Sequence, residues 1–174
     1  FGVSDNVDLN DVKWSRGGYD KTALSKLYTG YDLRVMLILK ELNKYVADMD
    51  KVKGLGFCVS KEHAEYMAQR FNQNNIPSIA LTADSKKDER DSAQRKLAEG
   101  GIKFIFTVDL YNEGVDIPEV NTVMFLRPTE SLTVFLQQLG RGLRLSDGKD
   151  CLTVLDFIGQ AHMKYNFESK LYFM

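Results

Sequence analysis

The segment 137–144, which reads Gln-Gln-Leu-Gly-Arg-Gly-Leu-Arg, holds the residues of this chain that are best suited to chemistry. It places the guanidinium groups of Arg141 and Arg144 three residues apart and beside glycines. An arginine stays protonated at neutral pH, and its planar fork of donors matches phosphate oxygens. At this spacing both side chains can face one ligand, so the pair could stabilise negative charge on a polyphosphate. The plainer alternative is a helix end whose arginines interact with the negative end of the helix dipole.

A second polar motif covers residues 112–118 and reads Asn-Glu-Gly-Val-Asp-Ile-Pro. It places the carboxylate of Asp116 two positions after Gly114, in a loop that Pro118 makes stiff. A carboxylate there can accept hydrogen bonds from ribose hydroxyls, and the glycine lets the backbone approach a ligand or another chain closely. The alternative is an ordinary turn closed by an Asx hydrogen bond. Neither motif decides the function by itself.

Length and composition favour one compact domain. The chain has 174 residues, of which 44% are hydrophobic, and only three prolines. The 23 Lys and Arg residues nearly balance the 24 Asp and Glu residues, so nothing global attracts nucleic acid and any such contact must be local. No apolar run is long enough to span a membrane and no signal core is present, which predicts a soluble, cytoplasmic protein. The chain begins with Phe1 rather than Met, so we expect it to be cut from a longer one.

The cysteines and histidines give no sign of a metal or disulfide site. Cys58 and Cys151 lie in apolar stretches and are too few for a disulfide scaffold, which predicts buried, reduced thiols in a reducing compartment. His63 and His162 have no carboxylate or cysteine at catalytic spacing, so we expect both of them at the surface.

Apolar patterns predict an alternation of strands and helices. Short apolar runs without polar interruption are typical of strands buried on both faces of a parallel sheet, and repeats of three and four residues indicate amphipathic helices. The predicted strands are 55–59, 78–81, 102–108, 122–126 and 151–157, and the predicted helices are 31–49, 61–73, 88–99 and 131–139. This order predicts a doubly wound α/β fold, with a mainly parallel sheet and helices on both faces.

The predicted elements divide the chain into three parts. Residues 1–50 form a lead-in, in which a loop and a short helix near 21–27 precede the first long helix. Residues 51–160 form the α/β domain. Residues 161–174 form an aromatic-rich extension that we expect to pack on this domain or on a neighbouring one.

Sites in such folds lie at the carboxyl ends of the strands. Polar side chains follow every predicted strand there, namely Ser60 with Lys61, then Thr82, Thr107 to Asp109, Arg127 to Thr129, and Asp156. We expect Ser60, Lys61 and Thr82 to contact backbone phosphates of nucleic acid, which read shape and charge rather than sequence. For Ser60, a role limited to capping the following helix is the favoured alternative.

Residues 113–118, followed later in the chain by Gln-x-x-Gly-Arg-x-x-Arg, resemble motifs V and VI of superfamily 2 helicases and translocases. The resemblance extends from Gly54 to about Ile158. Residues 57–60 look like motif IV of that superfamily, and residues 127–131 are similar to the DEAD/DEAH-box proteins grouped with type III restriction subunits. The resemblance implies the second RecA-like domain of a two-domain ATP-driven motor, with the fold of a P-loop NTPase helicase C-terminal domain.

The resemblance also implies roles for single residues. Arg141 and Arg144 match the motif VI arginines that reach the nucleotide's phosphates, with Gln137 and Gly140 at that motif's other fixed positions; Gly114 and Asp116 match motif V positions near the ribose and the domain interface. In the superfamily, a threonine that contacts nucleic acid lies at the position that Val108 occupies in this chain. Thr107 lies one residue earlier, so the phosphate contact implied for Thr107 rests on a match shifted by one position.

The sequence lacks a lysine-bearing phosphate loop and an acidic motif for Mg²⁺. We therefore expect ATP and Mg²⁺ to be held by an N-terminal RecA-like domain of the same chain, with this domain supplying arginine fingers and gripping nucleic acid, DNA in preference to RNA. The motor module could be attached to a nuclease. Two other hypotheses are a non-catalytic RecA-like docking module and a free-standing nucleotide-binding α/β enzyme, which would need a glycine-rich loop after its first strand.

Overall fold

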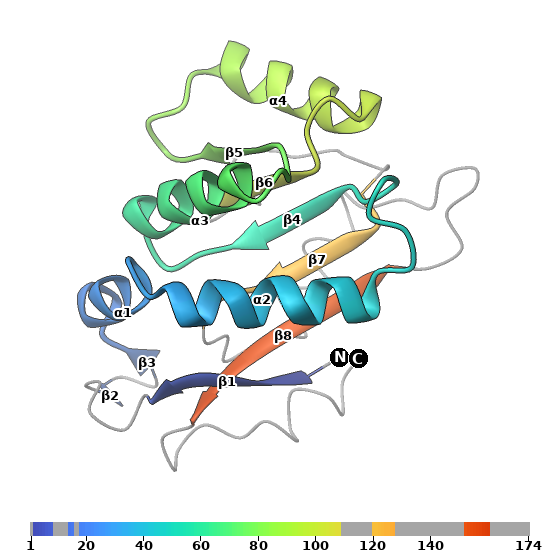
Figure 1. The fold of residues 1–174 in the computed structure, drawn as a ribbon. Coiled ribbons are helices and arrows are strands. Elements are labelled where there is room, and N and C mark those ends of the chain that lie inside the picture. The colour runs from blue at the N-terminus through green and yellow to red at the C-terminus, as the bar shows by residue number, and fades with distance from the viewer. Residues whose placement is uncertain (1, 9–13, 16–17, 109–119, 128–151, 161–174) are drawn as a thin grey trace.

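The computed structural model describes residues 2–8, 14–15, 18–108, 120–127 and 152–160 (Figure 1). Their centre is a six-stranded sheet in the order β1-β8-β7-β4-β6-β5, and every neighbouring pair in it is parallel. Helices cover both faces of this sheet. The predicted α/β class, with a parallel sheet between helices, is therefore confirmed.

The element bounds follow the predicted alternation closely. The strands are β1 (Gly2–Asp8), β4 (Gly54–Phe57), β5 (Ser78–Leu81), β6 (Phe104–Thr107), β7 (Thr122–Phe125) and β8 (Thr153–Gln160), with a separate antiparallel ribbon of β2 (Trp14–Ser15) and β3 (Gly18–Tyr19). The helices are α1 (Lys21–Tyr28), α2 (Asp32–Tyr45), α3 (Lys61–Gln73) and α4 (Lys87–Glu99). The predicted helix over 131–139 lies outside the described residues. Within the described part of the chain, no helix has the length and apolar character needed to cross a membrane.

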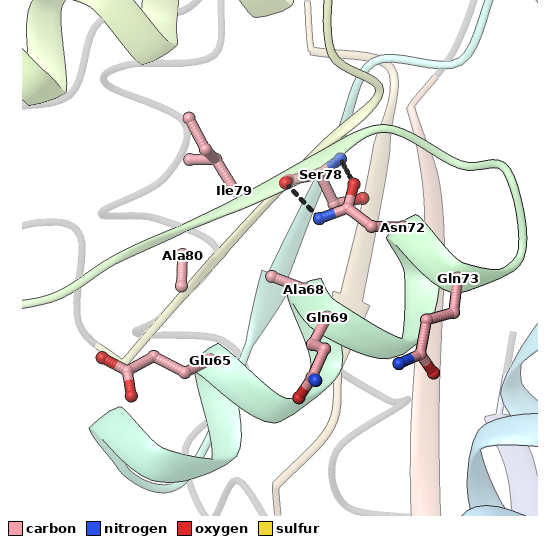
Figure 2. A pocket seen from close by; sticks show the side chains of 8 residues that line it. All are labelled: Glu65, Ala68, Gln69, Asn72, Gln73, Ser78, Ile79 and Ala80. Carbon is pink, nitrogen blue, oxygen red and sulfur yellow. Dashed lines mark hydrogen bonds between the residues drawn. The ribbon is translucent and has the colours of Figure 1, made fainter.

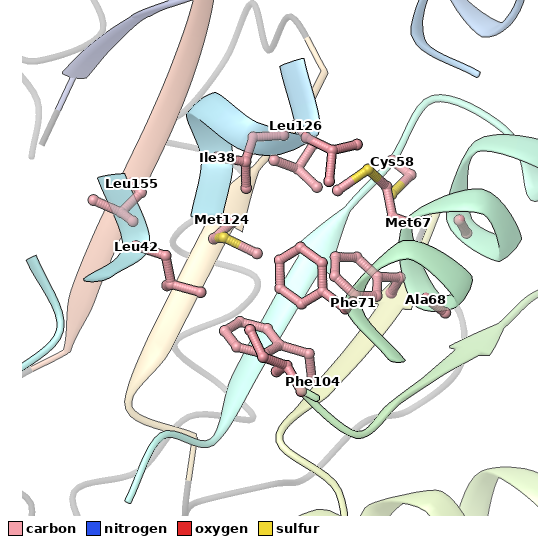
Figure 3. Close-up of a cluster of buried hydrophobic side chains, with 14 of the residues drawn as sticks. Ile38, Leu42, Cys58, Met67, Ala68, Phe71, Phe104, Met124, Leu126 and Leu155 are labelled. Carbon is pink, nitrogen blue, oxygen red and sulfur yellow. The ribbon is translucent and has the colours of Figure 1, made fainter. Parts of the chain in front are cut away.

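Helices α2 and α3 cover one face of the sheet (Figure 3). Phe71 of α3 lies edge-on against two rings from β6, at centroid distances of 5.3 Å to Phe104 and 4.8 Å to Phe106. The apolar face predicted for this helix is buried as expected, because its residues recur every three or four positions.

Helix α4 covers the opposite face. It buries Ala93 and Leu97 there, beside residues of five strands. Phe57 of β4 stacks on Phe125 of β7 in the same layer, with a centroid distance of 5.5 Å. Successive side chains of β5, β6 and β7 therefore enter opposite cores, which explains why the sequences of these strands have no polar alternation.

Two glycines in β4 make room for the aromatic rings of β6. A Cβ atom on Gly54 would lie 2.1 Å from the Phe104 ring, and a Cβ atom on Gly56 would lie 2.5 Å from the Phe106 ring. Both rings are fully buried. Because these two positions have no side chain, the rings of Phe104 and Phe106 can extend over β4 on the face that α2 and α3 cover.

The lead-in differs from its prediction. Residues 2–8, expected as loop, form strand β1, which pairs with β8 at one edge of the sheet. The segment has few apolar residues, so its sequence gives no strand pattern, and its place is fixed by backbone pairing with β8. The short helix expected near 21–27 is confirmed as α1.

Helix α2 buries only part of the face that its apolar pattern predicts. Leu33 and Met36 belong to that pattern, but they are 63% and 66% exposed. Leu42, which also belongs to it, is buried, together with Val35 and Ile38, which do not. Apolar residues occupy nearly every position from 33 to 39, so periodicity alone could not select the buried face.

We predict that Gly56→Ala destabilises the domain by about 1–3 kcal/mol, because the new methyl group would overlap the buried Phe106 ring. Gly101→Ala is the matched control, since the nearest atom to its new Cβ, the Lys96 carbonyl oxygen, is 3.6 Å away. The control should change the free energy of unfolding by less than about 1 kcal/mol. Urea unfolding of the three proteins measures this difference, and equal midpoints for Gly56→Ala and the parent would contradict it.

Candidate functional site

The carboxyl ends of the strands in the six-stranded sheet lie along one side of it, next to α1 (Figure 1). This side is the carboxyl edge of the sheet, which is distinct from its outer strands β1 and β5. The pairing register sets Thr107 of β6 level with Phe57 of β4 and Leu81 of β5. It also sets Phe125 of β7 level with Phe57 and with Asp156 of β8. Ser60, Lys61, Thr82 and Thr107 are thus brought to one edge, as the sequence predicted. Asp156 lies level with the end of β7 but inside β8, which continues to Gln160.

Ser60 serves as the N-cap of α3. Its Oγ accepts a hydrogen bond from the His63 backbone N–H at 3.1 Å and lies 2.6 Å from the Oγ of Ser25 in α1. The capping role that the sequence favoured is confirmed. A phosphate contact by Ser60 stays a prediction.

Lys61 begins α3 and forms an ion pair with Asp84, which lies in the loop after β5. The distance from Lys61 Nζ to Asp84 Oδ2 is 2.7 Å, and the two side chains are 47% and 74% exposed. Their hydrogen bond raises the pKa of Lys61 and lowers the pKa of Asp84. Glu62 and Glu65 add to the rise in the pKa of Lys61, so this cation lies among carboxylates.

Thr82 and Thr107 are buried at the ends of β5 and β6. Thr82 Oγ1 accepts from the Asp84 backbone N–H at 3.3 Å, and the Thr82 N–H donates to Ser85 Oγ at 3.0 Å. The Thr107 carbonyl accepts from the Cys58 N–H at 2.7 Å, while Thr107 Oγ1 finds no hydrogen-bond partner among the described residues. Both threonine side chains therefore offer little surface to a ligand in this conformation.

The residues assigned to the nucleotide and to the domain interface lie outside the described part of the chain. These are Arg141, Arg144, Gln137, Gly140, Gly114 and Asp116. Their roles stay predictions, and so do the expectations for Cys151 and His162. Cys58 is a buried free thiol, as predicted, and burial raises its pKa.

A buried arginine that the sequence analysis did not single out holds two elements at this edge. Arg34 of α2 is 1% exposed, and its Nη2 donates to the Leu126 carbonyl, just after β7, at 2.8 Å. Its guanidinium carbon lies 3.9 Å from the centroid of the Tyr28 ring of α1, within the range of a cation–π contact. The ring of Tyr28 in turn lies 5.1 Å from that of His63. This Arg34–Tyr28–His63 cluster joins α1, α2 and α3 to the strand ends.

The surface position expected for His63 is wrong, because the side chain is fully buried. Its Nδ1 accepts a hydrogen bond from the Val59 N–H at 3.1 Å. Burial lowers the pKa of His63 well below its usual value, and the charge of Arg34 lowers it further. A signal was present in the sequence, since His63 lies four residues before Met67 and so shares its buried helix face.

A shallow pocket lies between α3 and the edge strand β5, and no residue of the Arg34–Tyr28–His63 cluster lines it (Figure 2). Asn72 crosses it, with its side-chain amide donating to the Ser78 carbonyl at 3.0 Å and accepting from the Ser78 N–H at 2.8 Å. These bonds satisfy outward backbone groups of the edge strand. Glu65 is the one ionisable lining residue, so the pocket has no set of groups for catalysis.

Comparison with known proteins gives a consistent family. A family model described as "Helicase conserved C-terminal domain" matches residues 36–146. The "Putative ATP-dependent helicase IRC3" of Saccharomyces cerevisiae is 31% identical over 157 residues, which cover 90% of this chain and 23% of that protein. The "Type I restriction enzyme EcoKI endonuclease subunit" of Escherichia coli is 31% identical over 120 residues, or 62% of this chain and 10% of that protein.

The solved structures add the fold. The Escherichia coli DEAD-box protein SrmB, solved in complex with a regulator of ribonuclease activity, superposes with a TM-score of 0.59 at 19% identity, covering 72% of this chain and 69% of that one. At that identity the likeness concerns the fold alone. The chain spans about a quarter of the length of the yeast helicase relative and a tenth of the length of the restriction enzyme subunit.

We predict that stability falls as the pH drops below about 6.5, the ordinary pKa of histidine. Between that value and the lowered folded-state pKa of His63, the unfolded chain binds a proton that the folded chain does not. The free energy of unfolding should therefore decrease by up to about 1.4 kcal/mol per pH unit from this group. Above this window both states are neutral and the effect is absent.

The matched variant for this measurement is His63→Gln, which is polar and cannot take up a proton. Urea unfolding of parent and variant over a pH series isolates the contribution of His63, because every other group titrates in both proteins. The difference in stability between them should shrink as the pH falls. A difference that stays constant through this range would contradict the prediction.

Proposed function

The chain belongs to the helicase conserved C-terminal domain family, and on that premise we propose that it is the second motor domain of an ATP-dependent nucleic-acid helicase or translocase. The observation that supports this most strongly is the extent of the family match, since residues 36–146 include both the strand-end loops and the arginine motif. In this proposal, the edge that gathers those loops faces nucleic acid and a second lobe. Arg141 and Arg144 act there as arginine fingers.

ATP is bound mainly by a first RecA-like domain of the same polypeptide, which also provides the ligands of Mg²⁺. The yeast relative, which is named a putative ATP-dependent helicase and of which this chain covers 23%, supports the use of ATP and leaves room for a further domain. The chemistry of the strand ends supports a separate nucleotide-binding domain as well, because β4 runs into α3 through Ser60, whose hydroxyl caps the helix, without a glycine-rich loop. Among the described residues, no three His, Cys, Asp or Glu side chains are grouped to hold a metal ion.

The proposed division of labour follows from these features. In this proposal, the interface to the first domain is lined by Gln137, Gly140, Gly114 and Asp116. Asp116 lies near the ribose. Closing the cleft moves Arg141 and Arg144 onto the phosphates, where their fixed positive charge stabilises the transferring phosphoryl group. Opening it withdraws them, so the state of the nucleotide changes the distance between the two lobes.

The grip on nucleic acid is local in this proposal. The chain has a formal net charge of -1, so a general basic surface does not attract the ligand. Lys61 is the exposed cation at the start of α3, at the edge where β4 and β5 end. Contacts from this edge bind the phosphate backbone and carry no sequence preference. The relatives include both a restriction endonuclease subunit and proteins named ATP-dependent RNA helicases, and DNA remains the preferred nucleic acid in this proposal.

We predict that Arg141→Ala and Arg144→Ala each reduce nucleic-acid-stimulated ATP hydrolysis by roughly 10³- to 10⁵-fold, the usual effect of removing an arginine finger. The assay uses the polypeptide that joins this chain to its nucleotide-binding domain. Folding and weak ATP binding should persist, because the arginines act on the transition state. Arg95→Ala, an exposed arginine on α4, is the control and should leave turnover unchanged. Parental turnover in both finger variants would refute the assignment.

A further inference from the structure

The predicted nucleic-acid contacts differ in what they can offer a phosphate. The hydroxyl of Ser60 is engaged with α1 and with the first turn of α3, and the hydroxyl of Thr82 accepts from the Asp84 N–H. Thr107 is fully buried. Lys61 therefore has the most exposed polar group of the four, and its ammonium is occupied by Asp84.

The backbone of Asp84 is held in place by its own loop. Thr82 and Ser85 form a turn after β5 in which Thr82 Oγ1 accepts from the Asp84 N–H and the Ser85 N–H donates to the Thr82 carbonyl at 3.0 Å. A side-chain acceptor of this kind fixes the backbone without using the carboxylate. The loop after β5 thus presents Asp84 to the first residue of α3, so the pair joins that loop to the start of the helix after β4.

The charges around Lys61 oppose the approach of a phosphate. Asp84 contacts the ammonium, and Glu62 and Glu65 are close enough to raise the pKa of Lys61 as well. A phosphate that reaches Lys61 must replace the carboxylate of Asp84 and move it away. Replacement is feasible because both side chains are largely in water, where an ion pair is weak.

We propose that Asp84 is an electrostatic latch on Lys61, which holds the ammonium in the free domain and releases it to a backbone phosphate of single-stranded nucleic acid. This inference rests on the proposed function, since it regulates the same grip. It implies that the domain binds nucleic acid more weakly than its exposed lysine would allow. A weak contact that a phosphate can replace suits a translocating enzyme, because such an enzyme must release the nucleic acid in every cycle of ATP hydrolysis.

The test measures binding of a fluorescein-labelled single-stranded oligothymidylate to this chain by fluorescence anisotropy over a series of salt concentrations. Asp84→Asn should tighten binding about two- to five-fold at low salt, the range expected for an exposed ion pair. The gain should shrink as the salt concentration rises, because salt screens the exposed Lys61–Asp84 attraction that the substitution removes. Lys61→Gln should weaken binding, and in the double variant Asp84→Asn should add nothing.

The matched control is Asp91→Asn, which removes the same charge from an exposed position on α4. An equal gain in Asp91→Asn and Asp84→Asn, with Lys61→Gln still weakened, would overturn the latch and leave the proposed grip intact. A gain from Asp84→Asn that persists in the double variant would also overturn the latch. If Lys61→Gln binds like the parent, or the parent does not bind at low salt, then the grip by Lys61 fails and the latch fails with it.

Discussion

Strand β4 pairs in parallel with both β6 and β7 in one register, and this pairing determines how the other elements are arranged. Parallel neighbours need crossover connections, and these place helices on both faces of the sheet. The strands must then be apolar on both sides, as β4, β6 and β7 are. The same pairing brings the carboxyl ends together, so the loops that leave them share one edge. Fold and candidate site are two consequences of one pairing pattern.

Close approach within that sheet depends on two glycines. Gly54 and Gly56 leave space over β4 that the rings of Phe104 and Phe106 fill. Phe71 of α3 then contacts both rings at edge-on angles of 78° and 81°. Edge-to-face packing of this kind is favourable for aromatic pairs. The position of α3, and with it the position of Lys61 at its first turn, follows from this aromatic layer.

Much of the fold was predictable because burial on two faces leaves a clear signal in the sequence. The strands β4, β5, β6 and β7 and the helices α3 and α4 lie within a few residues of their predicted places. Strand β1 was not predictable, because it is a mainly polar segment held by the backbone of β8. The buried face of α2 was ambiguous for the opposite reason, since the helix is apolar on several sides.

The site was predictable in part. The polar residues at the strand ends predicted which side of the sheet carries the site. The capping role of Ser60 was predictable from its position before α3. Burial of His63 was missed although its spacing from Met67 places it on the buried face of α3. Burial of Arg34 was missed because a sequence does not show which polar side chains find partners inside. The partner of Lys61 was missed for a related reason. Asp84 belongs to a loop that only the folded sheet brings near it.

The buried charge of Arg34 explains how the lead-in becomes part of this edge. Burying a guanidinium is costly unless its donors and charge find partners, and here Nη2 donates to a carbonyl while the cation lies against an aromatic face. The carbonyl belongs to Leu126, one residue before Arg127, and the aromatic ring belongs to Tyr28 of α1. The family match begins at residue 36, so both Tyr28 and Arg34 precede it. Removing the lead-in would leave the Leu126 carbonyl and the buried ring of His63 without these contacts, and therefore α1 and the start of α2 belong with the strand ends that they cover.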